Sequence, residues 1–205
     1  MAAQLPVVFR SGMGDSRFSF DWFDYAAGAG YQRFYAAGAW HSGGAVRFLT
    51  TQTATDPDDV NGARYSAGAS VDVDFDITFN NPVTIAAADS IVNLTSYQQS
   101  AGNTSFVVNV YHVTSGGTET SLGTITSGNT DAGALGYIRR CARVTLTSKS
   151  FAVGEKLRLN IIYTGSGANS NIIHDPNSRQ TVTEAGSGLT IKTSLTFDVP
   201  FKVDI

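Results

Sequence analysis

Apolar and polar residues alternate along much of this chain with a period of two, which is the pattern of a β-strand that buries one face. The clearest run is 70–79, where apolar residues occupy every second position from Val71 onward. Asp72, Asp74 and Asp76 fill the positions between them and would line the opposite face. We interpret this acidic face as the solvated outer side of a sheet, with a ladder of metal ligands as the alternative.

Similar patterns follow at short intervals, and turns rich in Gly, Pro, Asn and Asp separate them. They cover 46–51, 83–85, 91–97, 106–113, 121–126, 137–146 and 189–205. Pro200 lies inside the last run and indicates an edge strand, a bulge or a bend, because proline cannot donate to a ladder. No helical periodicity persists over a full window. The sequence therefore predicts an all-β fold, a two-sheet antiparallel β-sandwich.

Two strand patterns and an intervening turn occur within 142–164, a segment that we interpret as a β-hairpin. Apolar residues alternate with polar ones on both arms, from Val144 before the turn and from Leu157 after it. Gly154 can supply the positive φ that such a turn needs. A second hairpin is predicted within 106–126. A two-stranded ribbon is marginal in water, so each apolar face requires a second sheet to cover it.

Residues 1–15 form a predicted extended N-terminal arm, and residues 16–205 a single β-sandwich domain. Leu5, Val7 and Phe9 give the arm an apolar patch. Because a neighbouring subunit can hold an arm of this kind, these three residues are candidate interface contacts. An ordinary edge strand is the alternative interpretation.

The segment that follows, 18–40, holds nine aromatic residues. Its candidate interface residues are Trp22, Tyr25, Tyr31, Tyr35 and Trp40. Such rings offer large contact areas and the neighbouring Ala and Gly residues allow close approach, although the same rings could instead fill a core. The pentapeptide YAAGA occurs at 25–29 and again at 35–39, which indicates two similar turns.

Composition and charge argue against several classes of function. Charged residues make up 15% of the chain and the formal net charge is −3, so no overall basic field favours nucleic acid. No run of 18 apolar residues and no secretion signal is visible, so we expect no membrane partner. Cys141 is the sole cysteine, which excludes an intramolecular disulfide, and we expect it to be a small buried thiol.

Arg139, Arg140 and Arg143 form the one basic concentration in the sequence. In a strand, Arg139 and Arg143 would share a face with Cys141, and Arg140 would point to the other face. Guanidinium groups suit interfacial ion pairs, so these three arginines are candidate contacts to an adjoining subunit. Pairing within the chain, with the acidic face of 72–76, is the alternative.

No catalytic constellation emerges from the residue types and their spacing. The three histidines, His41, His112 and His174, accompany neither a nucleophile elbow nor a zinc-ligand cluster. His112 is expected to be a structural ring within a strand, and His174 would point away from the adjacent Asp175 in an extended chain. The loop 56–62 offers oxygen ligands but departs from the EF-hand spacing. We therefore expect no enzymatic activity, no bound metal and no cofactor.

The run FAVGEKLRL at 151–159 resembles the strand-turn-strand motif of many jelly-roll sandwiches. The surrounding chain is rich in Ala, Gly, Thr and Ser and is similar to tailed-phage virion proteins. In size and in its lack of a fibre repeat, the chain looks most like the tailed-bacteriophage capsid decoration, or cement, proteins. That resemblance implies a jelly-roll-like sandwich, often trimeric, located on the capsid surface of the virion. Such a protein bridges major capsid subunits without catalysing a reaction.

Two other functions remain open. A carbohydrate-binding module would use Trp22, Trp40 or nearby tyrosines as a flat platform for sugar rings, and jelly rolls commonly have that role. A receptor-binding head of a phage tail or fibre protein would present the same surface. Glycan arrays would separate both from a cement protein.

The aromatic segment and the apolar arm exceed what a monomer of this size needs, so we predict a homotrimer. Light scattering of the isolated protein should give three times the mass of one chain. A species that stays monomeric at high concentration, and on its native particle, would contradict this prediction.

Overall fold

The computed structural model describes residues 18–19, 29–41, 44–52, 65–67, 70–98, 102–127, 130–132, 136–165, 171–174, 181–183, 190–192 and 195–202. Within these ranges every regular element is a β-strand. In chain order the strands are β1 (Phe18–Ser19), β2 (Ala29–His41), β3 (Gly44–Thr50), β4 (Tyr65–Ala67), β5 (Ser70–Thr78), β6 (Val83–Ile85), β7 (Asp89–Gln98), β8 (Gly102–Val113), β9 (Glu119–Thr126), β10 (Thr130–Ala132), β11 (Gly136–Thr145), β12 (Lys149–Phe151), β13 (Lys156–Thr164), β14 (Asn171–Ile173), β15 (Thr181–Thr183), β16 (Thr190–Lys192) and β17 (Thr196–Lys202). None of the described segments is a helix that could cross a membrane.

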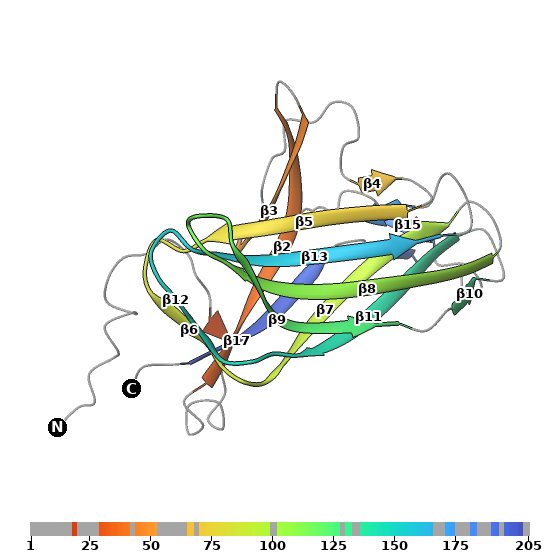
Figure 1. The fold of residues 1–205 in the computed structure, drawn as a ribbon. Coiled ribbons are helices and arrows are strands. Elements are labelled where there is room, and N and C mark those ends of the chain that lie inside the picture. The colour runs from red at the N-terminus through yellow and green to blue at the C-terminus, as the bar shows by residue number, and fades with distance from the viewer. Residues whose placement is uncertain are drawn as a thin grey trace.

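Fifteen strands belong to one continuous sheet that folds over on itself through β3, and eight of them form its two packed layers, each of which we describe as a sheet (Figure 1). In the first, which we call the β2 sheet, the order is β11, β7, β17, β2. In the second, the β5 sheet, the order is β9, β8, β13, β5. All of these pairings are antiparallel. Along the chain the eight strands alternate between the two sheets, except that β8 and β9 both lie in the β5 sheet. This is the strand order of a jelly roll, so the predicted all-β, two-sheet, jelly-roll-like sandwich is confirmed.

The remaining strands extend the two sheets at their margins. β3 pairs with the second half of β2 and meets β5 through one parallel bridge between Phe48 and Asp76. β1 lies against β2, β10 lies against β8, and β14 joins β7 to β4. β6 joins β12 to β17, and β15 and β16 form a separate two-stranded sheet. In Figure 1 β3 and the second half of β2 rise steeply from the body that the other long strands form.

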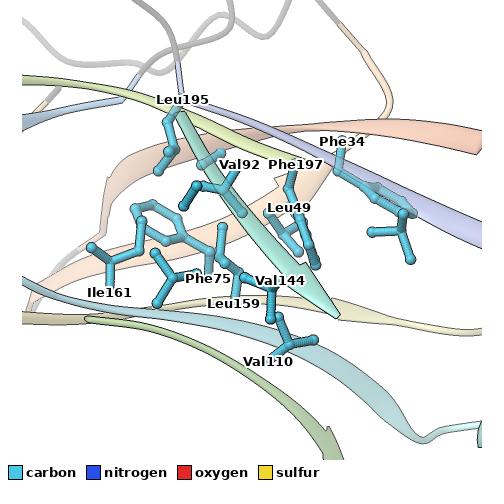
Figure 2. Close-up of a cluster of buried hydrophobic side chains, with 14 of the residues drawn as sticks. Phe34, Leu49, Phe75, Val92, Val110, Val144, Leu159, Ile161, Leu195 and Phe197 are labelled. Carbon is cyan, nitrogen blue, oxygen red and sulfur yellow. The ribbon is translucent and has the colours of Figure 1, made fainter. Parts of the chain in front are cut away.

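An apolar layer fills the space between the two sheets (Figure 2). The β5 sheet contributes Phe75 and Leu159 and the β2 sheet contributes Val92 and Phe197, all with 0% exposure. Complete burial of side chains of this size stabilises the fold by about 1.5–3 kcal/mol each. The alternation predicted for 70–79 is confirmed over the first six residues of β5, where exposed polar and buried apolar positions alternate.

The predicted hairpin at 142–164 is wrong in its pairing. The first arm lies in β11 and pairs with β7 in the β2 sheet, whereas the second arm lies in β13 and pairs with β5 and β8. The turn is as predicted, since Gly154 has a φ of +84°. The second predicted hairpin is confirmed as β8 and β9, with Gly117 at a φ of +87°. Alternation showed that each arm buries one face, but it does not identify the neighbouring strand.

Two further expectations are corrected in β2 and β17. Residues 35–39 are not a turn but the middle of β2, where Ala36 is fully buried. Of the three alternatives offered for Pro200, the edge strand is wrong, because β17 is flanked by β2 and β7. The ladder to β7 ends at Asp198, and β17 next meets β6 at Phe201. Pro200, which has no N–H to donate, therefore lies between the end of the β7 ladder and the bridge to β6.

Gly123 of β9 lies where the edges of the two sheets approach one another. A Cβ added there would meet Thr145 O at 2.5 Å and Val144 Cγ1 at 3.0 Å, and the first contact is with immovable backbone. We expect Gly123→Ala to lower the free energy of unfolding by about 1–3 kcal/mol through overpacking. Urea denaturation measures this change. Gly116→Ala is the matched control, because the nearest atom to its added Cβ lies 3.8 Å away; equal stability of the two variants would contradict the prediction.

Candidate interaction face

The outer face of the β2 sheet brings together four of the candidate contacts from distant parts of the sequence. Tyr31 and Tyr35 come from β2, and Arg139 and Arg143 come from β11 at the other side of the sheet. Both strands turn their alternate, buried residues toward the core, so these four side chains face outward. The Tyr31 hydroxyl donates a hydrogen bond to the backbone carbonyl of Asp89 at 2.9 Å, which holds its ring across the sheet.

The register of the ladders aligns further side chains into rows across this face. One row runs through Tyr35, Thr196, Asn93 and Cys141, and the next runs through Arg33, Asp198, Ile91 and Arg143. Ile91 is 37% exposed and places an apolar side chain in the middle of the second row. Sequence reasoning missed Arg33, Ile91, Asn93 and Asp198 because only the strand order places them beside the tyrosines and arginines. We call the surface formed by Tyr31, Arg33, Tyr35, Ile91, Arg139, Cys141 and Arg143 the tyrosine–arginine face.

The arginines of this face differ in how far they are neutralised. Arg33 Nε and Nη2 donate to the two carboxylate oxygens of Asp198 at 2.6 and 2.8 Å, and this hydrogen bonding raises the pKa of Arg33. Arg143 Nε lies 3.3 Å from Asp89 Oδ2, with both side chains exposed, and an ion pair of that kind is weak in water. Arg139 is also exposed. The guanidinium groups of Arg139 and Arg143 are therefore accessible to a partner.

Arg140 points the other way, into the space between the two sheets, as the strand pattern predicted. Its guanidinium carbon lies 5.6 Å from the centre of the Phe106 ring, and Nη2 donates a hydrogen bond to the Thr104 hydroxyl. Burial lowers the pKa of Arg140, and the nearby Tyr163 partly offsets that effect. Arg140 is therefore not part of the tyrosine–arginine face; its side chain reaches β8 and so links the two sheets.

Cys141 corrects one expectation, because it is exposed and not a buried thiol. Ala142 and Val144 are the inward residues of β11, so the odd-numbered positions, including Cys141, face solvent. Residue type alone suggested burial, but the pleat of the strand determines the direction of the side chain.

Several sequence-predicted residues lie outside the part of the chain that the structure describes. These are Leu5, Val7, Phe9, Trp22 and Tyr25, together with the arm at 1–15 and the loop at 56–62. Trp40 lies in β2, but its side chain is not among the described ones.

The outer face of the β5 sheet carries Asp72, Asp74 and Asp76, and its charges are paired within the sheet. Arg158 donates to both carboxylate oxygens of Asp76, from Nε at 2.7 Å and from Nη2 at 2.8 Å. Its Nη1 donates to Glu119 at 2.6 Å and lies 2.9 Å from Asp74. These carboxylates, Asp76 foremost, raise the pKa of Arg158.

A chain of hydrogen bonds crosses all four strands of the same sheet. Asn160 Nδ2 donates to Asp72 at 2.7 Å and to Asp74 at 2.8 Å, and Asn160 Oδ1 accepts from Asn109 Nδ2 at 2.9 Å. Asn109 Oδ1 in turn accepts from the Thr124 hydroxyl at 2.5 Å. The acidic residues thus pair with β13, so the expected alternative, in which the β11 arginines pair with residues 72–76, is wrong. Arg143 does pair within the chain, but with Asp89.

His112 is a structural ring, as the strand pattern predicted. It is buried, its Nε2 lies 2.9 Å from Glu155 Oε2, and its ring centre lies 4.9 Å from that of Phe151. The Ala152 N–H donates to Glu155 at 2.7 Å, and this bond, followed by His112, lowers the pKa of Glu155. Among the described residues, no group of three or more His, Cys, Asp or Glu side chains could hold a metal ion.

His174 lies in the core with 1% exposure, and its ring centre is 5.1 Å from that of Phe75 in an edge-to-face contact. Neither ring nitrogen has a hydrogen-bond partner in the described part of the chain. Burial, with a smaller effect from the charge of Arg47, lowers the pKa of His174 to about 3. The ring is therefore neutral near pH 7, and Asp175 lies outside the described residues.

No protein-family model and no curated protein matches this sequence. The fold is similar to a CocE/NonD family hydrolase from Staphylococcus aureus, with 11% identity and a TM-score of 0.43 over 82% of this chain and 34% of that chain. An α-amino acid ester hydrolase gives 12% identity and a TM-score of 0.38 over 66% of this chain and 26% of that one. A structure of infectious bursal disease virus, Gx strain, gives 15% identity and a TM-score of 0.22 over 85% of this chain and 48% of that one. This chain thus spans about a third or less of the hydrolases, and TM-scores this low carry no weight for function.

The buried His174 predicts a loss of stability in acid. Its pKa falls from 6.5 to about 3 on folding, so the unfolded state binds the proton more readily. The stability present above pH 6.5 is therefore lost as the pH falls toward 3, by at most about 1.4 kcal/mol per pH unit.

His174→Phe retains an aromatic ring against Phe75 and cannot titrate. Its free energy of unfolding, measured by urea denaturation between pH 7 and pH 4, should fall less steeply than that of the wild type. Parallel slopes for the two proteins would show that His174 does not titrate as described.

Proposed function

We propose that this protein is a virion structural protein, a capsid decoration protein that binds the outer capsid surface and bridges major capsid subunits. The observation that carries this proposal is the tyrosine–arginine face. Tyr31 and Tyr35 with Arg139 and Arg143, singled out in the sequence as contacts, lie together on one outer surface.

The composition of this face suits a protein partner. Tyrosine and arginine are enriched at protein interfaces, and the exposed Ile91 and the flanking polar residues supply an apolar centre with a polar rim. The acidic face of the β5 sheet is a weaker candidate, because Arg158 and Asn160 already satisfy its carboxylates. Arg139 and Arg143 are therefore the accessible cations that can pair with acidic groups on the capsid.

A decoration protein needs no catalytic centre, metal, cofactor, nucleic acid or membrane. It stabilises the shell because each copy binds only the assembled state and shifts the equilibrium away from disassembly. Many copies, each a homotrimer with several identical faces, multiply the effect through avidity.

A carbohydrate- or receptor-binding head of a tail or fibre protein is the second candidate function. Tyr31 and Tyr35 are partly exposed on the same face, and an aromatic surface of this kind can also stack against sugar rings. Specific signals on a glycan array, with no binding to capsids, would favour this second function.

Cys141 allows the capsid interface to be tested with the natural side chain, because it is the only cysteine and lies in the middle of the proposed face. We expect attachment of a polyethylene-glycol maleimide to Cys141 to weaken binding to particles stripped of this protein by about tenfold or more. The reason is that the polymer would occupy the surface that contacts the capsid. Co-sedimentation of labelled and unlabelled protein with the particles measures the change.

The control is the double variant Cys141→Ser, Thr126→Cys, which moves the label to an exposed position on β9 in the β5 sheet. Labelled at Thr126→Cys, the protein should bind as well as the unlabelled protein does. Equal binding of both labelled proteins would exclude the tyrosine–arginine face as the contact. Failure of the unlabelled protein to bind any particle would reject the decoration function itself.

A further inference from the structure

Arg47 lies in β3, and the alternation of the strand turns it toward the core side of the sandwich. It shares its side of β3 with the buried Leu49, two positions further along the strand. The parallel bridge joins Phe48 to Asp76, and the Asp76 carboxylate points outward. In the same register the preceding residues of the two strands, Arg47 and Phe75, are neighbours, and both are on the inward side. The Arg47 side chain remains partly exposed, which leaves it open to solvent.

His174 lies beside the same phenylalanine. Its ring packs edge-to-face on Phe75 at 5.1 Å and is 1% exposed. His174 Nδ1, His174 Nε2 and Arg47 Nε are all buried, and none has a hydrogen-bond partner in the described part of the chain. The charge of Arg47 acts on His174, so the two side chains lie near one another. Native proteins pair nearly all of their buried polar atoms, so these neighbouring unpaired nitrogens call for a ligand.

No described carboxylate neutralises Arg47. Every carboxylate whose side chain the structure describes is engaged elsewhere: Asp72 and Asp74 with Asn160, Asp76 and Glu119 with Arg158, Asp89 with Arg143 and Thr145, Glu155 with His112, and Asp198 with Arg33. A partly buried guanidinium without an anion is costly, since desolvation opposes its charge.

We propose that Arg47 and His174 form a binding site for a monoanionic carboxylate. The guanidinium N–H groups of Arg47 donate to the carboxylate oxygens in the planar geometry that suits them, and the neutral imidazole of His174 donates its one N–H. A single positive charge matches a monoanion, whereas a phosphate dianion would keep an unbalanced charge in a partly desolvated site. The site is separate from the tyrosine–arginine face and does not depend on the proposed function.

Acetate is the probe for this site. Thermal unfolding of the full-length chain is followed at pH 7 in sodium acetate and in sodium chloride of equal ionic strength. At saturating concentration acetate should raise the Tm by about 3 °C or more, because it binds the folded state alone. Arg47→Gln should abolish the difference between the two salts, and Arg139→Gln, which removes an exposed arginine elsewhere, should retain it.

A second measurement needs no variant. In the wild-type protein, acetate should shift the ring-nitrogen NMR resonances of His174 in a saturable manner, while those of His112 stay unchanged because Glu155 already faces that ring. Equal Tm values in acetate and chloride together with an unmoved His174 signal would overturn the proposal. A response to phosphate at the same ionic strength that exceeds the response to acetate would overturn the assignment to a carboxylate.

Discussion

The packing of two four-stranded sheets against one apolar layer is the constraint on which the rest of this structure depends. Each strand must turn alternate residues toward that layer, and the direction of every intervening side chain follows from the same pleat. Val144 faces inward, so Cys141 and Arg143 face solvent; Phe75 faces inward, so Asp74 and Asp76 face solvent. One packing requirement thus defines both outer surfaces.

The two outer surfaces that result are chemically different. On the β5 sheet Arg158 and Asn160 bind the aspartates in a network that spans the sheet, and these groups stiffen it while leaving little unpaired charge. On the β2 sheet the exposed Arg139 and Arg143 lie on the same surface as two tyrosines. A protein partner would gain more from the second surface, because Arg139 and Arg143 are exposed there and the ion pair of Arg143 with Asp89 is weak in water.

Some polar side chains also lie inside the sandwich in the described part of the chain. Arg140 crosses between the sheets and is stabilised by the Phe106 ring and the Thr104 hydroxyl. Arg47 Nε and both ring nitrogens of His174 have no such partner in the described part of the chain. The contrast separates a polar contact that completes the fold from the unpaired groups on which the proposed carboxylate site rests.

The sequence by itself determined the all-β class and which residues of β5 face the core. It also determined that Arg139 and Arg143 face one side of their strand and Arg140 the other, and that Gly154 has a positive φ. Each of these features depends on neighbours within a few residues. The tertiary structure decided which strands pair, and with that the separation of β11 from β13 and the meeting of β2 with β17. It also decided that Cys141 is exposed and that Arg158 neutralises the aspartates. A period-two pattern states that a strand has a buried face, but many pairings bury that face equally well, and only the competition among all strands for neighbours selects one.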